Sequence, residues 1–157
     1  MSYSAVIAKQ VDLYLHSQDW HYDFDQENGA FDFGMNISGK VKNLRMRIML
    51  GDDYFTVYAI APMRADENDL ETLDLVNEYL TRANFGLRTG NFELDFRDGE
   101  MRYKASLFCA DEVPSIKMIE RVVDVPFLMW KRYGTGMINV LYGGKSPADE
   151  IAAVETE

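Results

Sequence analysis

The sequence predicts an α+β domain in which helices pack on a mostly antiparallel sheet. Stretches of alternating apolar residues fill much of the first half of the chain, and a hairpin pattern with an Asp-Gly turn lies in the second half. Helical periodicity appears before, between and after these strand patterns. Because short turns join the consecutive strands, we expect them to pair antiparallel. The predicted order is helix, three or four strands, helix, hairpin and long helix.

A single domain over residues 1–157 is expected from the length, and the 47% hydrophobic content is ample for one core. No run of about 18 apolar residues suggests a membrane span, and the first residues lack the basic head of a signal peptide. Cys109 is the single cysteine and has no partner for an internal disulfide. These features favour the cytoplasm and give no reason to expect a membrane partner.

The net charge is −10, from 26 acidic and 16 basic residues. A surface of this sign repels a phosphate backbone unless a basic patch overrides it, so nucleic acid is not an expected partner. A protein partner agrees better with the charge.

The first half of the chain reads as one helix followed by strands. Residues 5–17 have apolar side chains at helical spacing, and a weak strand is expected at 22–25. Stronger alternation predicts strands at 31–37, 44–50 and 54–61, with turns at 38–40 and 51–53, and Pro62 is expected to end the last of these strands.

The second half holds the longer helices. Residues 66–84 form the clearest helical pattern, with acidic residues in its first turn. The last long pattern follows Pro114 and ends at Gly143-Gly144, with Pro126 inside it. Since the apolar phase continues across Pro126, we favour one kinked helix, with two shorter helices as the alternative. Ser146 is a plausible N-cap for a short tail helix within 146–157, which is expected to fray.

Glu93 and Asp95 raise the question of a two-carboxylate hydrolase site, because same-face residues on one strand lie about 6.6 Å apart. Pairing outward from a two-residue Asp98-Gly99 turn places Glu93 opposite Lys104 and Asp95 opposite Arg102. A base facing each acid favours the ionised form, whereas a catalytic acid must hold its proton. A charge-paired ladder is therefore the preferred interpretation.

The other chemical candidates are weak. His16 and His21 lie among aspartates but lack the spacing of a metal motif. The glycine-rich stretches 134–139 and 143–146 fail as phosphate-binding motifs in both spacing and context. Their preferred role is punctuation of a helix, that is, to interrupt or end it. Cys109 has no neighbouring base in the sequence. We therefore expect no catalytic residue, no metal and no cofactor, and hence no enzyme.

A possible interaction face lies on the strands around 44–50 and 54–61. Lys40, Lys42, Arg45 and Arg47 form a basic cluster on an otherwise acidic chain. Arginine, methionine and tyrosine on one sheet face are typical of a protein interface. The candidate partner-binding residues are Arg45, Arg47, Met49, Thr56, Tyr58 and Ile60. The alternatives are a solvated face, or a face covered by the domain's own helices.

Residues 84–107, NFGLRTGNFELDFRDGEMRYKASL, and 141–155, LYGGKSPADEIAAVE, resemble the YbjN-domain family of bacterial proteins, as does the order of elements. The resemblance covers nearly the whole chain. It implies a fold similar to that of type III secretion chaperones and a role in sensory transduction or stress regulation. The family offers no established catalytic residues, and its chaperone-like relatives dimerise and bind protein segments. The latter is an analogy of fold.

We therefore expect a non-catalytic protein-binding module, chaperone-like or a regulatory adaptor, that forms a homodimer or binds another protein. The alternative is a small-ligand sensor with a pocket between the sheet and the last long helix, lined by Phe127 and Trp130.

Overall fold

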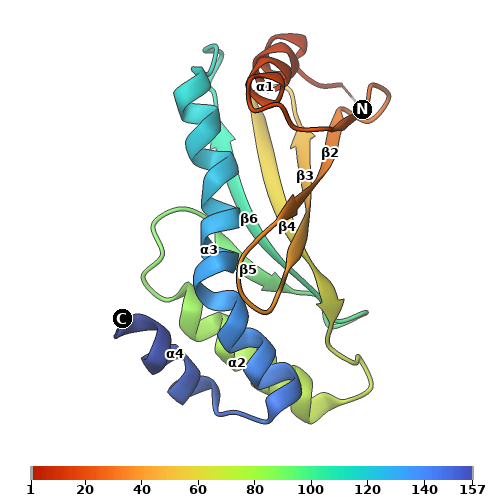
Figure 1. Ribbon diagram of the computed structural model, residues 1–157. Helices are drawn as coiled ribbons and strands as arrows, with labels where there is room; N and C mark the ends of the chain where they lie inside the picture. The colour runs from red at the N-terminus through yellow and green to blue at the C-terminus, as the bar shows by residue number, and fades with distance from the viewer. Residues whose placement is uncertain (1, 157) are drawn as a thin grey trace.

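The computed structural model describes residues 2–156, so Met1 and Glu157, the two ends of the expected domain, lie outside the described residues. The chain runs from α1 at one end of the molecule to α4 near the other (Figure 1). Its elements are α1 (Ala5–Ser17), β1 (Asp23–Asp25), β2 (Ala30–Asn36), β3 (Asn43–Leu50), β4 (Tyr54–Arg64), α2 (Leu70–Asn84), β5 (Asn91–Leu94), β6 (Glu100–Phe108), α3 (Ile116–Gly143) and α4 (Pro147–Glu155).

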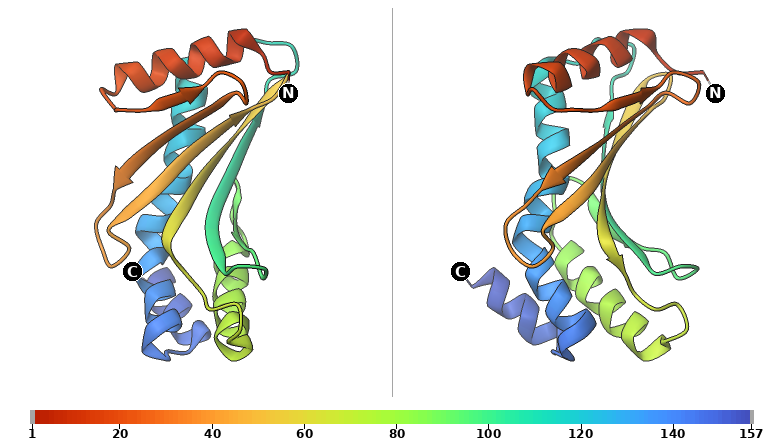
Figure 2. Two further views of the ribbon diagram at one scale, coloured as in Figure 1. Left: turned by 90° about the vertical axis from the view of Figure 1, so that its right-hand side faces the viewer. Right: turned by 45° about the vertical axis from the view of Figure 1, so that its right-hand side comes forward.

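The six strands of the described chain form one antiparallel sheet in the order β1-β2-β3-β4-β6-β5. The predicted α+β fold class is therefore confirmed. The first four strands follow one another as a meander, and α2 then carries the chain to β5 at the far edge. β6 returns between β5 and β4. The helices of residues 2–156 lie on one side of the sheet and leave its other face free of helices (Figure 2).

Strict alternation along the central strands decides which side chains meet the helices. In β3, Leu44, Met46 and Ile48 are buried in the core on the helix side, while Arg45 and Arg47 point to the other face. The buried set continues across β4 and β6 and meets buried side chains of α1, α2 and α3. This single core fixes the faces of all the central strands, because a shift of one residue would reverse every side chain.

α2 begins later than the sequence pattern predicted. Asp69 is its N-cap and its carboxylate accepts the Thr72 N–H at 3.0 Å. Residues 66–68 form a turn instead, in which the Asp66 carboxylate accepts the Asn68 N–H at 2.9 Å. Acidic residues are common both in turns and in the first turn of a helix. The acidic residues at 66–69 therefore led to a predicted helix start that is too early.

α3 is one helix from Ile116 to Gly143, so the predicted single helix is confirmed over two shorter ones. Pro126 is buried within it. Gly134 and Gly136 lie inside this helix and do not end it, contrary to the punctuation role predicted for 134–139. A Cβ on Gly136 would overlap the Tyr79 hydroxyl of α2, and a Cβ on Gly134 would lie 2.6 Å from Val41 Cγ2. Both glycines let α3 approach its neighbours closely.

β4 runs beyond the proline that was expected to end it. The strand reaches Arg64, and its pairing with β6 changes register between Ile60 and Arg64. Pro62 is exposed at this irregularity, the kind of position in which a strand tolerates a residue without an N–H. The longer strand brings Arg64 opposite Glu100.

The β5–β6 hairpin is shifted by two residues from the predicted register. β5 ends at Leu94, and Glu93 pairs with Arg102 instead of Lys104. The turn is longer than two residues because the Asp95 carboxylate accepts the Arg97 N–H and the Asp95 carbonyl accepts the Gly99 N–H. An even shift keeps each side chain on its predicted face, so acids and bases still share one face.

The tail helix begins at the predicted cap. The Ser146 hydroxyl accepts the Asp149 N–H, and Pro147 occupies the first turn. Ile151 is buried, and α4 packs against α2 and α3. The expected fraying of this segment stays a prediction.

Candidate protein-binding face

The structure brings all six predicted partner-binding residues together. β3 and β4 pair so that Arg45 is opposite Ile60, Arg47 opposite Tyr58 and Met49 opposite Thr56. These three rungs lie on the sheet face that no helix covers (Figure 2). The possibility that the domain's own helices cover this face is therefore excluded. We call this surface the helix-free face.

The shape of the face follows from the bend of the strands. In the right-hand view of Figure 2 the middle of the sheet curves toward α3, which makes the helix-free face concave. Thr56 and Ile60 are buried there by neighbouring side chains of the sheet itself, and the Thr56 hydroxyl hydrogen-bonds that of Ser106 at 2.7 Å. Arg45 is exposed and makes no ion pair within residues 2–156. The centre of the face is thus packed, and Arg45 contributes an exposed cation to it.

The basic residues that are close together in the sequence do not all lie on the same surface of the fold. Arg45 and Arg47 stay on the helix-free face, where Arg47 lies 3.9 Å from Asp32. Lys40 belongs to the loop after β2 and its ammonium donates to the Asn139 side chain of α3 at 2.5 Å. Lys40 therefore links the loop to α3 and adds nothing to the face.

Residues of β5 and β6 complete the face, and the sequence reasoning did not assign them to it. The guanidinium of Arg102 lies 4.2 Å from the centre of the Tyr58 ring, a cation–π contact that covers one side of the tyrosine. Thr56 lies opposite Ser106 and Tyr58 opposite Lys104 across the β4–β6 ladder. The alternation of β6 shows that these side chains share a face, but the insertion of β6 beside β4 is a long-range event without a local sequence signal.

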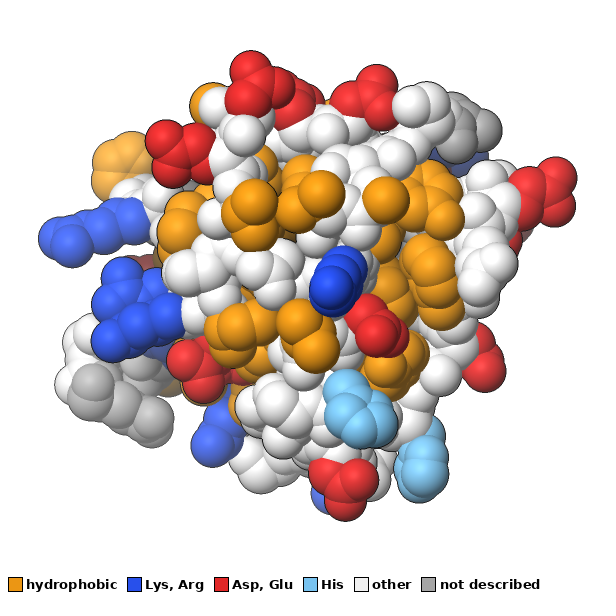
Figure 3. Space-filling model, turned by 90° about the horizontal axis from the view of Figure 1, so that it is seen from above, with side chains coloured by type: hydrophobic (Ala, Val, Ile, Leu, Met, Phe, Trp, Pro, Cys, Tyr) orange, Lys and Arg blue, Asp and Glu red, His pale blue; other side chains and the backbone are white. Residues whose placement is uncertain are grey.

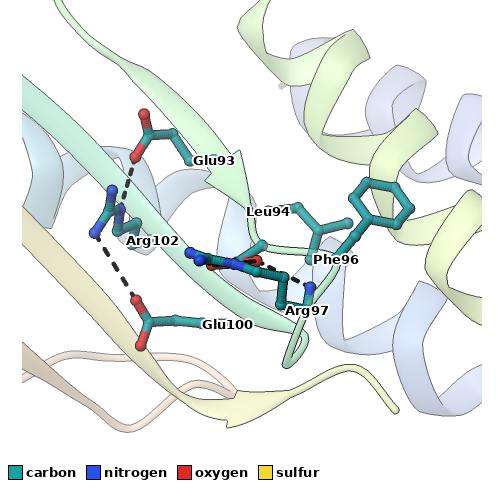
Figure 4. A pocket seen from close by; sticks show the side chains of 7 residues that line it. Glu93, Leu94, Phe96, Arg97, Glu100 and Arg102 are labelled. Atoms are coloured by element: carbon teal, nitrogen blue, oxygen red, sulfur yellow. Dashed lines mark hydrogen bonds and ion pairs between the residues drawn. The ribbon is translucent and has the colours of Figure 1, made fainter. Parts of the chain in front are cut away.

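The carboxylates of the hairpin line a hollow of about 500 Å³ at the edge of this face. Figure 4 shows Arg102 between two acids, Glu93 and Glu100. The Glu93 carboxylate accepts from Arg102 Nε and from Lys104 Nζ, each at 2.7 Å, and Glu100 lies 4.0 Å from Arg102. The predicted ion pair of Glu93 with Lys104 is confirmed, and Arg102 is a second partner of the same carboxylate. Asp95 pairs with Arg97 instead of the predicted Arg102.

The two candidate catalytic carboxyls are both held in the ionised form. Hydrogen bonds from the Arg97 side chain and backbone lower the pKa of Asp95 to about 2. Burial acts to raise the pKa of Glu93, but hydrogen bonds and charge from Lys104 and Arg102 together outweigh it and lower the pKa. A two-carboxylate hydrolase needs one protonated acid near neutral pH, and neither carboxyl has an environment that would keep the proton.

Glu93→Gln is expected to lower the free energy of unfolding by about 1 kcal/mol, because two partly buried cations lose their shared anion. Urea unfolding at neutral pH measures the loss. Because the folded pKa of Glu93 is depressed, its contribution is present above its ordinary value of 4.5 and disappears as the pH falls further.

Glu78→Gln is the matched control, since its exposed pair with Arg82 on α2 contributes no more than about 0.5 kcal/mol. A Glu93→Gln protein as stable as the control would contradict a structural role for Glu93. The hydrolase alternative makes that very prediction, together with loss of an activity.

The remaining candidate residues have no neighbours that would make them catalytic or metal-binding in the described part of the chain. Asp12 accepts a hydrogen bond from the Tyr22 hydroxyl at 2.6 Å, which raises the pKa of Tyr22 to about 12. Cys109 is buried after the end of β6, and burial raises the pKa of its thiol. Within residues 2–156, no group of three or more His, Cys, Asp or Glu side chains is arranged to hold a metal ion.

The pocket expected between the sheet and the last long helix is filled by protein. Trp130 is 1% exposed, and its indole N–H donates to the Ala59 carbonyl at 2.9 Å. Its ring also packs edge-on against Phe92 of β5. Phe127 is half-buried against the same core. The hollow beside α3 lies instead along its N-terminal half, against β6.

A second exposed apolar surface lies at the α1 end of the molecule. Viewed from above, apolar side chains gather around one basic and one acidic side chain that lie side by side (Figure 3). Val6 and Leu13 of α1 are about half exposed and line a shallow hollow together with Lys9. This surface lies at the end of the sheet and is separate from the six residues of the helix-free face.

Comparison of the chain with protein-family models and with curated proteins finds no match. The YbjN-domain resemblance therefore stays a prediction. None of the helices in residues 2–156 is both long and apolar enough to cross a membrane.

Proposed function

We propose that this chain is a non-catalytic protein-binding module, chaperone-like or a regulatory adaptor of the YbjN type, and that it acts in the cytoplasm. The observation that carries the proposal is the helix-free face. The six predicted partner-binding residues are of types common in protein interfaces. They form three adjacent cross-strand pairs of β3 and β4 on a concave sheet surface that no helix of residues 2–156 covers. Tyr58 and Met49 supply apolar area, and the exposed Arg45 supplies a directional charge.

The state of the hairpin carboxylates supports a non-catalytic role. Glu93 and Asp95 are each bound by cations and have lowered pKa values, so they serve the sheet as charge partners. The small-ligand alternative loses the lining predicted for its pocket, because Trp130 fills the space between α3 and β4. The hollow that does lie between the sheet and α3 is nearer the start of the helix and does not include Phe127 or Trp130.

A pull-down from a lysate of the native cells, followed by mass spectrometry, tests this proposal. We expect Arg45→Glu and Tyr58→Ala each to reduce the recovery of a partner that the unaltered protein enriches. Lys131→Glu is the control, because Lys131 is an exposed cation of α3 on the other side of the sheet. Equal recovery by all the variants would remove the helix-free face from the proposal.

The homodimer is part of the same proposal, with a second copy as one possible partner of the face. Light scattering at micromolar concentrations is expected to give twice the 18.0 kDa chain mass. A constant 18.0 kDa mass would exclude self-association and leave a different protein as the partner.

A further inference from the structure

An apolar groove of about 490 Å³ lies between α3 and the end of β6. One wall is an outward stripe of α3 at helical spacing: Met118, Val122, Val125 and Leu128. The other wall is formed by Ser106 and Leu107 of β6, and Thr89 lies at its side. Leu128 is 47% exposed and Met118 is 44% exposed, whereas Val122 is buried, so the two ends of the stripe are open to a partner.

The β6 wall of this groove is a free strand edge. β5 pairs with β6 only between Met101 and Lys104, so residues 105–108 have β4 on one side and no strand on the other. Within residues 2–156, no backbone hydrogen bond from the 85–90 loop reaches 106–108. Unpaired backbone groups at such an edge are a template for another strand.

Three exposed cations lie in or next to the lining of the groove, beside the carboxylates of Asp124 and Glu120, although the chain carries a net charge of −10. Arg121 lines the groove, Arg88 precedes its lining residue Thr89, and Lys117 precedes its lining residue Met118. All three cations are exposed, and none makes an ion pair within residues 2–156. The acidic lining residue, Asp124, accepts a hydrogen bond from Tyr14 of α1 at 3.4 Å.

We propose that this groove binds an extended segment of another protein, which adds a strand beside residues 105–108 of β6. Its alternate apolar side chains enter the stripe of α3, and its acidic residues meet Arg121, Arg88 and Lys117. A second copy of this chain is a poor occupant, because joining two such edges would bring the cations of both copies together. The α3 stripe of the groove lies outside the helix-free face, although Ser106 borders both, so failure of either proposal leaves the other standing.

A synthetic peptide tests the proposal on the full chain. The probe has about eight residues of alternating valine and threonine with an aspartate near each end and both termini blocked, since this length matches a typical strand. Fluorescence anisotropy is expected to give saturable binding with a Kd below about 1 mM that weakens as salt is added. Hydrogen exchange is expected to slow in residues 105–108, which distinguishes strand addition from simple apolar docking.

Three comparisons decide the outcome. Leu128→Glu and Arg121→Glu are each expected to weaken binding at least about tenfold. Leu13→Glu is the matched control and should bind normally, because Leu13 is a 48% exposed helical leucine of α1 outside the groove. A peptide with lysines in place of the aspartates is expected to bind more weakly.

The proposal is overturned if the unaltered chain does not bind the aspartate peptide, if the lysine peptide binds equally well, or if exchange slows elsewhere but not in 105–108. Light scattering in which Leu128→Glu turns a dimer into a monomer would also overturn it, because the occupant would then be a second copy.

Discussion

Trp130→Ala is expected to lower the free energy of unfolding by about 3–5 kcal/mol, the largest loss we predict for a single side chain. Trp130 lies in the core, where α3 packs on β4 and β6, and it is 1% exposed. Its removal leaves a cavity against Phe92 and takes away the N–H that binds the Ala59 carbonyl. Chemical denaturation followed by circular dichroism measures the loss.

Two companion variants make this result interpretable. Trp130→Phe keeps most of the ring but not the hydrogen bond, so a smaller loss of about 1–3 kcal/mol is expected if the alanine variant does not fold. Tyr142→Ala removes an exposed aromatic of the same helix and should change the stability by less than about 0.5 kcal/mol. A Trp130→Ala loss below about 1 kcal/mol would mean that Trp130 lines an open pocket, as the ligand-sensor alternative requires.

Gly136→Ala is expected to lower the free energy of unfolding by about 1–3 kcal/mol, although alanine is the better helix former. The new methyl group would overlap the hydroxyl of Tyr79, which is fully buried. That hydroxyl donates to the Tyr133 carbonyl at 2.7 Å, so it cannot move without losing a buried hydrogen bond. The junction of α2 and α3 therefore has to open. Thermal and urea unfolding measure the effect.

Gly143→Ala in the last turn of the same helix is the control. Its Cβ would come no closer than 3.8 Å to the Lys145 side chain, and the residue has no positive φ. We expect this change to leave the stability unaltered or raise it by up to about 1 kcal/mol. An equal gain from Gly136→Ala would show that α2 and α3 do not pack as closely as described.

The sequence was most informative where local chemistry decides the structure. The alternation of β3 and β4 and the short turn between them place Arg45, Tyr58 and Met49 on one face, because a tight hairpin fixes its own register. The N-cap residue Ser146 also predicted the start of α4, and the apolar periodicity that continues across Pro126 predicted that α3 is one helix.

What failed depended on contacts between distant parts of the chain or on competing turn chemistry. From the sequence alone, Gly136 is expected to mark the end of a helix. In the structure it lies inside α3, where it makes room for Tyr79 of α2. Asp95 reads as a strand residue until its carboxylate is seen to accept the Arg97 N–H and lengthen the turn. The sequence also could not predict that β6 enters between β4 and β5, which brings Arg102 over Tyr58.

Photo-crosslinking at the helix-free face tests the central claim most directly. A photoreactive amino acid replaces Arg45, an exposed residue of the face, and Lys131 of α3 in a control protein; both are illuminated in living native cells. The account predicts a discrete crosslinked product of the same mass in every preparation from position 45 and none from position 131. No product at position 45, or the same product from both positions, would contradict a protein-binding role for this face.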